Sequence, residues 1–166
     1  MKKRLAFVLV VLLAVSSFCF ADGFDIGLSA RVPIAEEPNI AVGLNIAGSV
    51  YFNNFVGIGI FGNVLYDIGS DELGMTIDAL LGPVIRVVNN RNFSLPVAFG
   101  LYGYYPLVFS DIFGGDPNVG IGANGTAQVK FGRTNHFYFR VQAAYEFLNG
   151  GEFVINSSVG IGFGRN

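Results

Sequence analysis

Large apolar residues occupy every second position through much of this chain, with Gly, Ser, Asn or a single charged residue between them. In the first such stretch one face carries Phe24, Ile26, Leu28, Ala30, Val32 and Ile34, and the other carries Gly23, Asp25, Gly27, Ser29 and Arg31. Successive side chains of a β-strand point to opposite faces, so this period of two predicts strands.

The alternation recurs until the end of the chain and divides it into eight predicted strands. They cover residues 23–34, 39–52, 55–66, 76–88, 93–105, 119–131, 136–148 and 153–163. Residues 53–54, 89–92 and 132–135 form short polar turns, whereas residues 67–75 and 106–118 form longer loops. An even number of strands, with short turns at one rim and longer loops at the other, is typical of an outer-membrane barrel.

Two other arrangements compete with a membrane barrel. Hydropathy alone would assign residues 38–66 and 92–110 to transmembrane helices, but Asn53, Asn54, Pro96 and strand-spaced glycines argue against helices in lipid. A soluble lipocalin-like barrel would instead bury the apolar face and expose the other, which is rich in Gly, Asn, Ser and Thr and poor in Lys and Glu. Small residues suit a narrow lumen better. The predicted fold class is therefore all-β, an eight-stranded antiparallel up-and-down transmembrane β-barrel, with the soluble periplasmic binding barrel as an alternative.

The composition fits a membrane barrel, with 52% hydrophobic and only 13% charged residues. The chain begins Met1-Lys2-Lys3-Arg4, followed by an apolar run to Val15 and small or apolar residues to Ala21, which predicts a secretory signal peptide at residues 1–21 and a single barrel domain at 22–166. The only cysteine, Cys19, lies in the signal segment, so the mature chain would contain no thiol. The alternative is a lipoprotein with Cys19 as its lipidated first residue.

Aromatic residues gather near the predicted strand ends, as the interfacial girdles of a membrane barrel do. If both chain ends are periplasmic, the periplasmic rim carries Phe24, Phe52, Phe93, Phe131, Phe137 and Phe163, and the outer rim carries Tyr66, Tyr105, Tyr145, Phe147 and Phe153.

With these features the whole mature chain resembles the small eight-stranded outer-membrane barrels, a group that includes OmpA-like, OmpX-like and OmpW-like proteins. The last strand, with Phe153, Ile155, Val159, Ile161 and Phe163 on one face, is similar to the C-terminal assembly signal of that group, although this chain continues to Asn166 instead of ending on the aromatic residue. The resemblance implies a place in the bacterial outer membrane with periplasmic N- and C-termini, contact with outer-membrane lipid, and insertion by the outer-membrane assembly machinery.

Seven charged residues have the parity of the lumen face: Asp25, Arg31, Asp78, Arg86, Lys130, Arg140 and Glu146. Strand direction places Arg31, Asp78 and Glu146 nearer the outside and the other four nearer the periplasm, which predicts two clusters of ion pairs. An eight-stranded barrel has an interior that side chains can just fill, so this set predicts a salt-bridged plug, with a narrow polar conduit as the alternative.

The predicted outer loops are acidic and one of them is apolar. The acidic residues are Glu36, Glu37, Asp67, Asp71, Glu72, Asp111, Asp116 and Glu152, whereas Arg91, Arg133 and Arg165 lie at the opposite rim. The apolar loop patch consists of Leu107, Val108, Phe109, Ile112 and Phe113, which could fold over the lumen, contact the outer leaflet, or bind a surface partner or a small apolar ligand.

Catalytic and cofactor signals are weak. His136 is the only histidine and is predicted to be an interfacial or turn-side residue, and the acidic spacing around Asp71 matches no calcium loop. Two Gly-x-Gly-x-x-Gly matches, at 57–62 and 120–125, lie within strands and open no helix, so they predict no dinucleotide site. The acidic mature chain is also a poor nucleic-acid binder. The sequence predicts a non-enzymatic outer-membrane barrel with a structural or surface-interaction role and no cofactor, with a narrow channel for small or apolar solutes as the alternative.

Overall fold

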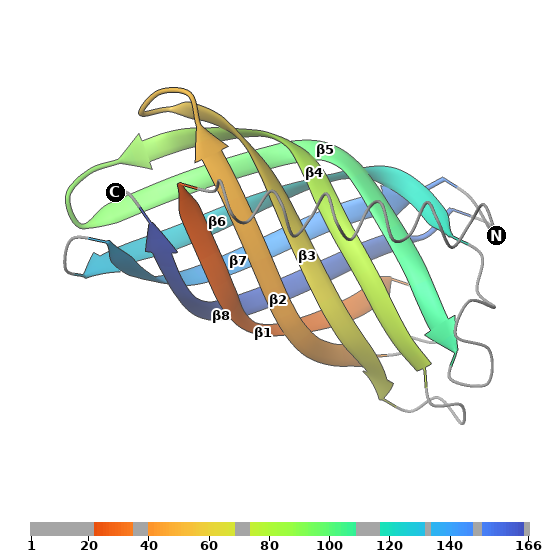
Figure 1. The fold of residues 1–166 in the computed structure, drawn as a ribbon. Coiled ribbons are helices and arrows are strands. Elements are labelled where there is room, and N and C mark those ends of the chain that lie inside the picture. Colours follow the sequence, from red (N-terminus) through yellow and green to blue (C-terminus); the bar gives the residue numbers. More distant parts are fainter. Residues whose placement is uncertain are drawn as a thin grey trace, which may run out of the picture.

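A computed structural model describes residues 22–34, 40–68, 74–108, 117–131, 134–147 and 151–164. They form one closed barrel in which every strand pairs antiparallel with its sequence neighbours and the first strand pairs with the last (Figure 1). The strands are β1 (Gly23–Ile34), β2 (Ile40–Tyr51), β3 (Val56–Ile68), β4 (Gly74–Asn89), β5 (Phe93–Val108), β6 (Asn118–Phe131), β7 (Asn135–Glu146) and β8 (Phe153–Gly164). The predicted fold class is confirmed. Among the described residues, no helix has the length and apolarity needed to cross a membrane.

The eight predicted strands match the observed ones to within a few residues, with one correction at β4 and β5. These two strands extend further than predicted, because Gly74 pairs with Val108 and Met75 pairs with Leu107. Leu107 and Val108 therefore belong to a strand, and their assignment to an apolar loop is wrong. The signal segment 1–21 and the patch residues Phe109, Ile112 and Phe113 lie outside the described residues.

The strands tilt strongly around the barrel. Following the paired residues once round from Phe24 of β1 leads through all the other strands to Phe153 of β8 and returns to β1 at Ile34, near its other end. This stagger links residues that are far apart in sequence across the lumen. We call the end where β1 begins and β8 finishes the turn end, because the short connections lie there (Figure 1), and the opposite end the loop end.

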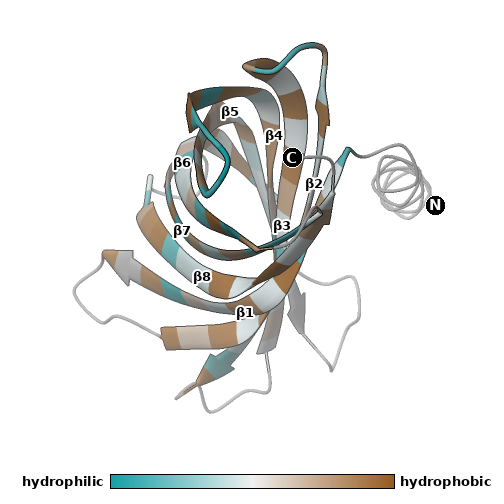
Figure 2. Cartoon of the chain, turned by 90° about the vertical axis from the view of Figure 1, so that its left-hand side faces the viewer, coloured by the Kyte–Doolittle hydropathy of each residue, from teal (hydrophilic) through white to brown (hydrophobic). Residues whose placement is uncertain are grey.

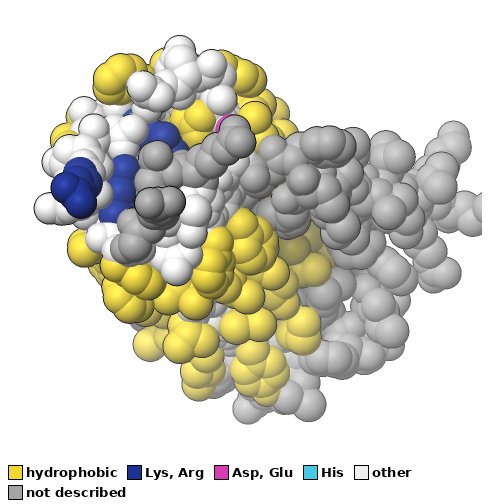
Figure 3. Space-filling view, turned by 60° about the vertical axis from the view of Figure 1, so that its left-hand side comes forward, with side chains coloured by type: hydrophobic (Ala, Val, Ile, Leu, Met, Phe, Trp, Pro, Cys, Tyr) yellow, Lys and Arg dark blue, Asp and Glu magenta, His cyan; other side chains and the backbone are white. Residues whose placement is uncertain are grey.

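Apolar and polar positions alternate along the strands (Figure 2), and the apolar ones face outward. Exposed hydrophobic side chains occur on all eight strands, and Figure 3 shows part of the apolar wall that they form. Exposed aromatic residues flank this wall: Phe52, Phe131, Phe137 and Phe163 at the turn end, and Tyr66, Tyr145, Phe147 and Phe153 at the loop end. Phe131 and Phe137 stack with their ring centroids 4.5 Å apart. An outer surface this apolar suits lipid and is the reverse of a soluble lipocalin-like barrel.

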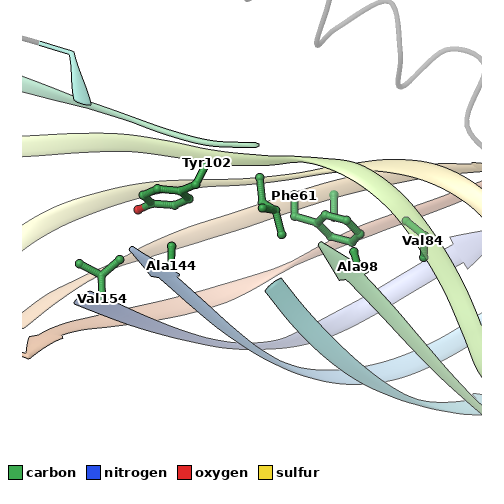
Figure 4. Packing of buried hydrophobic residues seen from close by; sticks show 8 residues of the cluster. Phe61, Val84, Ala98, Tyr102, Ala144 and Val154 are labelled. Atoms are coloured by element: carbon green, nitrogen blue, oxygen red, sulfur yellow. The ribbon is translucent and has the colours of Figure 1, made fainter. Parts of the chain in front are cut away.

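Part of the lumen is filled by an apolar cluster that was not predicted from the sequence. Its side chains come from six strands and meet inside the barrel (Figure 4), and they are Ala47, Phe61, Leu80, Val84, Ala98, Tyr102, Ala144 and Val154. Tyr51 and Tyr104 pack against the cluster. The polar side chains of the lumen therefore share the interior of the barrel with this apolar cluster.

Candidate functional site: the lumen

The five buried charged residues of the lumen lie on three different strands. Asp25 and Arg31 lie on β1, Asp78 on β4, and Arg140 and Glu146 on β7, and all five are buried. Charges this far from water are stable only when they are paired or hydrogen-bonded. The ion-pair and hydrogen-bond partners of these five residues therefore determine whether the lumen is closed or open to a ligand.

One ion cluster lies toward the turn end. The Arg140 guanidinium bonds the Asp25 carboxylate through Nη2 and donates from Nε to Thr126 Oγ1 at 2.9 Å. The other oxygen of Asp25 lies 2.8 Å from His136 Nε2, which is also 3.1 Å from Gln128 Nε2. Asp25 thus holds Arg140 and His136 together across the strand between β1 and β7.

Asn45 is the centre of the polar network. Its Oδ1 accepts hydrogen bonds from Arg140 Nη1 at 2.7 Å and from the Tyr138 hydroxyl at 2.9 Å. Its Nδ2 donates to Asn63 Oδ1 at 2.8 Å and to the Gly62 carbonyl at 2.9 Å. All four hydrogen-bonding positions of this buried amide are therefore used.

Glycine makes room for one of these contacts. A Cβ atom at Gly27 would lie 2.5 Å from the Tyr138 hydroxyl, because Tyr138 reaches from β7 toward β2 directly over the Gly27–Gly160 pair of β1 and β8. A glycine at position 27 is therefore needed for the Tyr138 side chain to cross the lumen face at this point.

Asp78 continues the network but forms no ion pair with a described cation. Its two oxygens accept from Asn63 Nδ2 at 2.6 Å and from Asn156 Nδ2 at 3.1 Å. The carboxylate, 1% exposed, is thus held by amides from β3 and β8. A continuous chain of contacts joins His136 to Asn156 through Asp25, Arg140, Asn45, Asn63 and Asp78.

A second ion pair lies toward the loop end. Arg31 Nη2 is 3.2 Å from Glu146 Oε1, and Asn118 Nδ2 donates to the other oxygen of Glu146 at 2.6 Å. The Arg31 guanidinium also lies 4.3 Å from the centre of the Tyr104 ring. Cation–π contact of this kind adds to the ion pair.

Arg86 and Lys130, the remaining two predicted lumen charges, lie near the turn end and have different partners. The Arg86 guanidinium stacks on Tyr51, 3.5 Å from its ring centre. Lys130 Nζ donates to Asn89 Oδ1 at 2.7 Å and to the Asn90 carbonyl at 2.9 Å. Within the described part of the chain, neither cation forms a salt bridge.

Three amides on adjacent strands leave polar atoms without protein partners. Asn124 of β6, Gln142 of β7 and Asn156 of β8 are direct cross-strand neighbours and are all buried. Both polar atoms of Asn124, Nε2 of Gln142 and Oδ1 of Asn156 have no hydrogen bond. Buried polar groups of this kind in proteins bind ordered water or a polar ligand.

His136 is the main correction at this site. It was predicted to be an interfacial or turn-side residue, but it is 4% exposed inside the lumen and contacts Asp25. Its strand parity is the same as that of Arg140 and Glu146, so the alternation already contained the signal. The amides Asn45, Asn63 and Asn156 share the lumen parity too, but parity alone does not distinguish them from the other polar lumen positions.

Some of the charged residues predicted at the two rims lie within the described part of the chain and others do not. Asp67 falls within β3, Glu152 is exposed just before β8, and Arg91 is exposed in a turn. The described residues contain no group of three or more His, Cys, Asp or Glu that could hold a metal ion. The other acidic loop residues, together with Arg133 and Arg165, lie outside the described residues: Glu36, Glu37, Asp71, Glu72, Asp111 and Asp116.

Comparison by sequence finds neither a matching protein-family model nor a curated relative. Comparison of structures does find matches. Neisserial surface protein A (NspA) superimposes with a TM-score of 0.69 at 7% identity, covering 86% of this chain and 96% of the other. The fold is that of the small eight-stranded outer-membrane barrels. The predicted resemblance is confirmed at the level of fold.

Two further barrels with this fold differ in what their names describe. Ail, the attachment invasion locus protein of Yersinia pestis, in complex with the heparin analogue sucrose octasulfate, matches with a TM-score of 0.57 at 16% identity over 85% of this chain and 95% of the other. The outer membrane enzyme PagL matches with a TM-score of 0.51 at 14% identity over 82% of this chain and 98% of the other. Because the fold hosts both an attachment protein and an enzyme, it does not by itself assign an activity.

Proposed function

We propose that this chain is a non-enzymatic barrel of the bacterial outer membrane with a structural or surface-interaction role. The observation that carries this proposal is the combination of a lipid-compatible outer wall with a filled lumen. The apolar cluster and the Asp25 to Asn156 network occupy the interior between them. Such packing makes the barrel a rigid support for whatever its loops contact.

The surroundings of His136 support a non-enzymatic role. Its Nε2 is already engaged by Asp25 and Gln128, and its Nδ1 is buried without a hydrogen-bond partner. A hydrolytic base needs a nucleophile or a positioned water within hydrogen-bond reach. Among the described residues, no serine or threonine hydroxyl contacts this histidine.

We propose that the turn end faces the periplasm, so that the loop end is the surface that partners meet. The sequence between β1 and β2, β3 and β4, and β5 and β6 contains Glu36, Glu37, Asp71, Glu72, Asp111 and Asp116 and no Lys or Arg. Like charges repel, so this rim suits a cationic or apolar surface partner better than a sulfated polysaccharide of the kind represented by the heparin analogue bound to Ail. The segments between these strands would give specificity, while the surrounding lipid and the outer-membrane assembly machinery would be the other partners.

The first experiment is expression of the full chain followed by envelope fractionation and gel analysis. We expect recovery in the outer membrane, a β-type circular dichroism spectrum, and faster migration of the unboiled protein in detergent gels. Mass spectrometry should give a mature chain beginning at Asp22. Recovery as a detergent-free periplasmic monomer would overturn the proposal and favour the soluble binding barrel.

The unpartnered amides favour one second candidate, a narrow channel. Water around Asn124, Gln142 and Asn156 would extend the polar chain from Asp78 toward Arg31, which pairs with Asn156 across β1 and β8. The measurement is conductance in planar bilayers. Stable unitary steps that change in Asp78→Asn or Gln142→Leu, and persist in the turn control Arg91→Gln, would support a channel. A wild-type protein that shows no conductance steps would support a lumen closed by its side chains.

A further inference from the structure

We propose that the lumen mouth at the turn end binds an oxyanion of the phosphate or sulfate class, held by Arg86, Lys130 and Ser94. These residues lie at the same end of three adjacent strands, β4, β6 and β5 respectively. Figure 3 shows Lys and Arg side chains at this end of the barrel.

A β-bulge creates the arrangement. The register between β4 and β5 shifts between Arg86 and Val88, which places Val87 and Val88 outward and leaves Arg86 and Asn89 directed to the lumen side. Bulges of this kind re-aim side chains and are common beside functional sites. Asn89 then fixes the ammonium of Lys130 by a 2.7 Å hydrogen bond that spans from β6 to β4 across the end of β5.

Ser94 lies on β5, the strand between the two that carry the cations. It pairs with Asn89 on one side and with Gln128 on the other, so its side chain is on the same lumen face. The Ser94 hydroxyl is completely buried and has no hydrogen-bond partner, and Arg86 Nε is also buried without one. The unpartnered Ser94 hydroxyl and the unpartnered Arg86 Nε–H, together with the ammonium of Lys130, form the donor set that an oxyanion requires.

The carboxylates at this end, Asp25 and Asp22, have other hydrogen-bond partners than Arg86 and Lys130. Asp25 contacts Arg140 and His136, and Asp22 accepts a hydrogen bond from the backbone N–H of Tyr51 at 2.9 Å. Among the described residues no carboxylate forms a salt bridge with Arg86 or Lys130. The stacking of Arg86 on Tyr51 holds the plane of the guanidinium and uses none of its N–H donors.

Titration calorimetry of the full chain tests the site, in an uncharged maltoside detergent and a chloride buffer. Inorganic phosphate is the probe. We expect saturable binding that weakens roughly tenfold or more in Arg86→Gln and in Lys130→Gln, and less in Ser94→Ala, because each change removes a charged or neutral hydrogen bond. Arg91→Gln, at an exposed turn arginine outside the lumen, is the matched control and should bind as wild type. Equal phosphate affinity in wild type, Arg86→Gln and Lys130→Gln would overturn the proposal.

A second experiment, in lipid nanodiscs, distinguishes a free anion from a phospholipid headgroup as the bound oxyanion. The chain is placed in phosphatidylcholine nanodiscs with or without phosphatidylglycerol, and the temperature at which the folded gel band disappears is recorded. If phosphatidylglycerol raises this temperature in wild type but not in Lys130→Gln, and free phosphate does not bind, the oxyanion is a headgroup. If neither free phosphate nor phosphatidylglycerol has an effect, the proposal is wrong. If Arg86→Gln does not show the folded band on unboiled gels, Lys130→Gln and Ser94→Ala are compared with wild type in both experiments.

Discussion

His136 Nε2 and Asp25 Oδ1 meet directly over Gly162, 2.8 Å apart. Gly162 lies on β8, between the two strands that carry these residues, and pairs with Asp25 on one side and with His136 on the other. A Cβ atom at position 162 would overlap both the imidazole and the carboxylate. The contact therefore requires a residue without a side chain on the intervening strand.

Gly162→Ala should destabilise the barrel by about 1–3 kcal/mol, because the added methyl group must displace a buried, hydrogen-bonded pair. The measurement is the fraction of protein that is folded in lipid vesicles at each urea concentration, read from the folded band on gels of unboiled samples. Gly125→Ala is the control, since a Cβ atom there meets nothing within 4 Å, and it should cause little or no loss. Equal stability of the two variants would show that the pair tolerates the methyl group.

Asn45→Ala should be more damaging than a typical core change, with an expected loss of about 3 kcal/mol or more. It removes the acceptor shared by Arg140 and Tyr138 and the donor to Asn63, which leaves several buried polar groups unsatisfied. The same folding assay applies. The control is Asn92→Ala at an exposed turn position. A loss no larger than that of the control would mean that water replaces Asn45 in the network.

The strands and their faces could be predicted because both follow from local alternation. Leu44 is 52% exposed and its neighbour Asn45 is 1% exposed, as a period of two requires. The pairing of lumen charges could not be predicted in the same way, because it depends on the stagger between strands that are not adjacent. Asp25 meets Arg140 from two strands away, and Asp78 meets Asn156 across the lumen.

Two other features depend on geometry that the residue pattern does not contain. The bulge beyond Arg86 turns two consecutive valines outward and leaves Asn89 facing inward beside Lys130, which an alternating pattern would not suggest. The apolar cluster around Phe61 and Leu80 was missed because the lumen was expected to be closed by ion pairs alone. Among the described residues, Asp78, Arg86 and Lys130 form no ion pair, so the expected ion pairing of these three charges remains a prediction.

Cysteine labelling should separate the two faces. In a Cys19→Ser background, Leu44→Cys and Ile58→Cys should react with a lipid-soluble maleimide in vesicles, because both side chains face outward. Ala47→Cys should not react, because Ala47 is buried in the lumen cluster. The three variants must show the same folded gel band. Labelling of Ala47→Cys with protection of Leu44→Cys would mean that the faces are inverted.

Labelling of intact cells should decide which end of the barrel faces outward. In a Cys19→Ser background, Asp71→Cys lies in the sequence that joins β3 to β4 at the loop end, and Asn92→Cys lies in an exposed turn at the other end. If the turn end is periplasmic, a membrane-impermeant maleimide added to cells should label only Asp71→Cys, because the outer membrane shields Asn92→Cys. Permeabilising the outer membrane should then make Asn92→Cys reactive as well, which shows that this turn is accessible. Labelling of Asn92→Cys alone in intact cells would reverse the orientation, and the oxyanion site would then open toward the medium and not toward the periplasm.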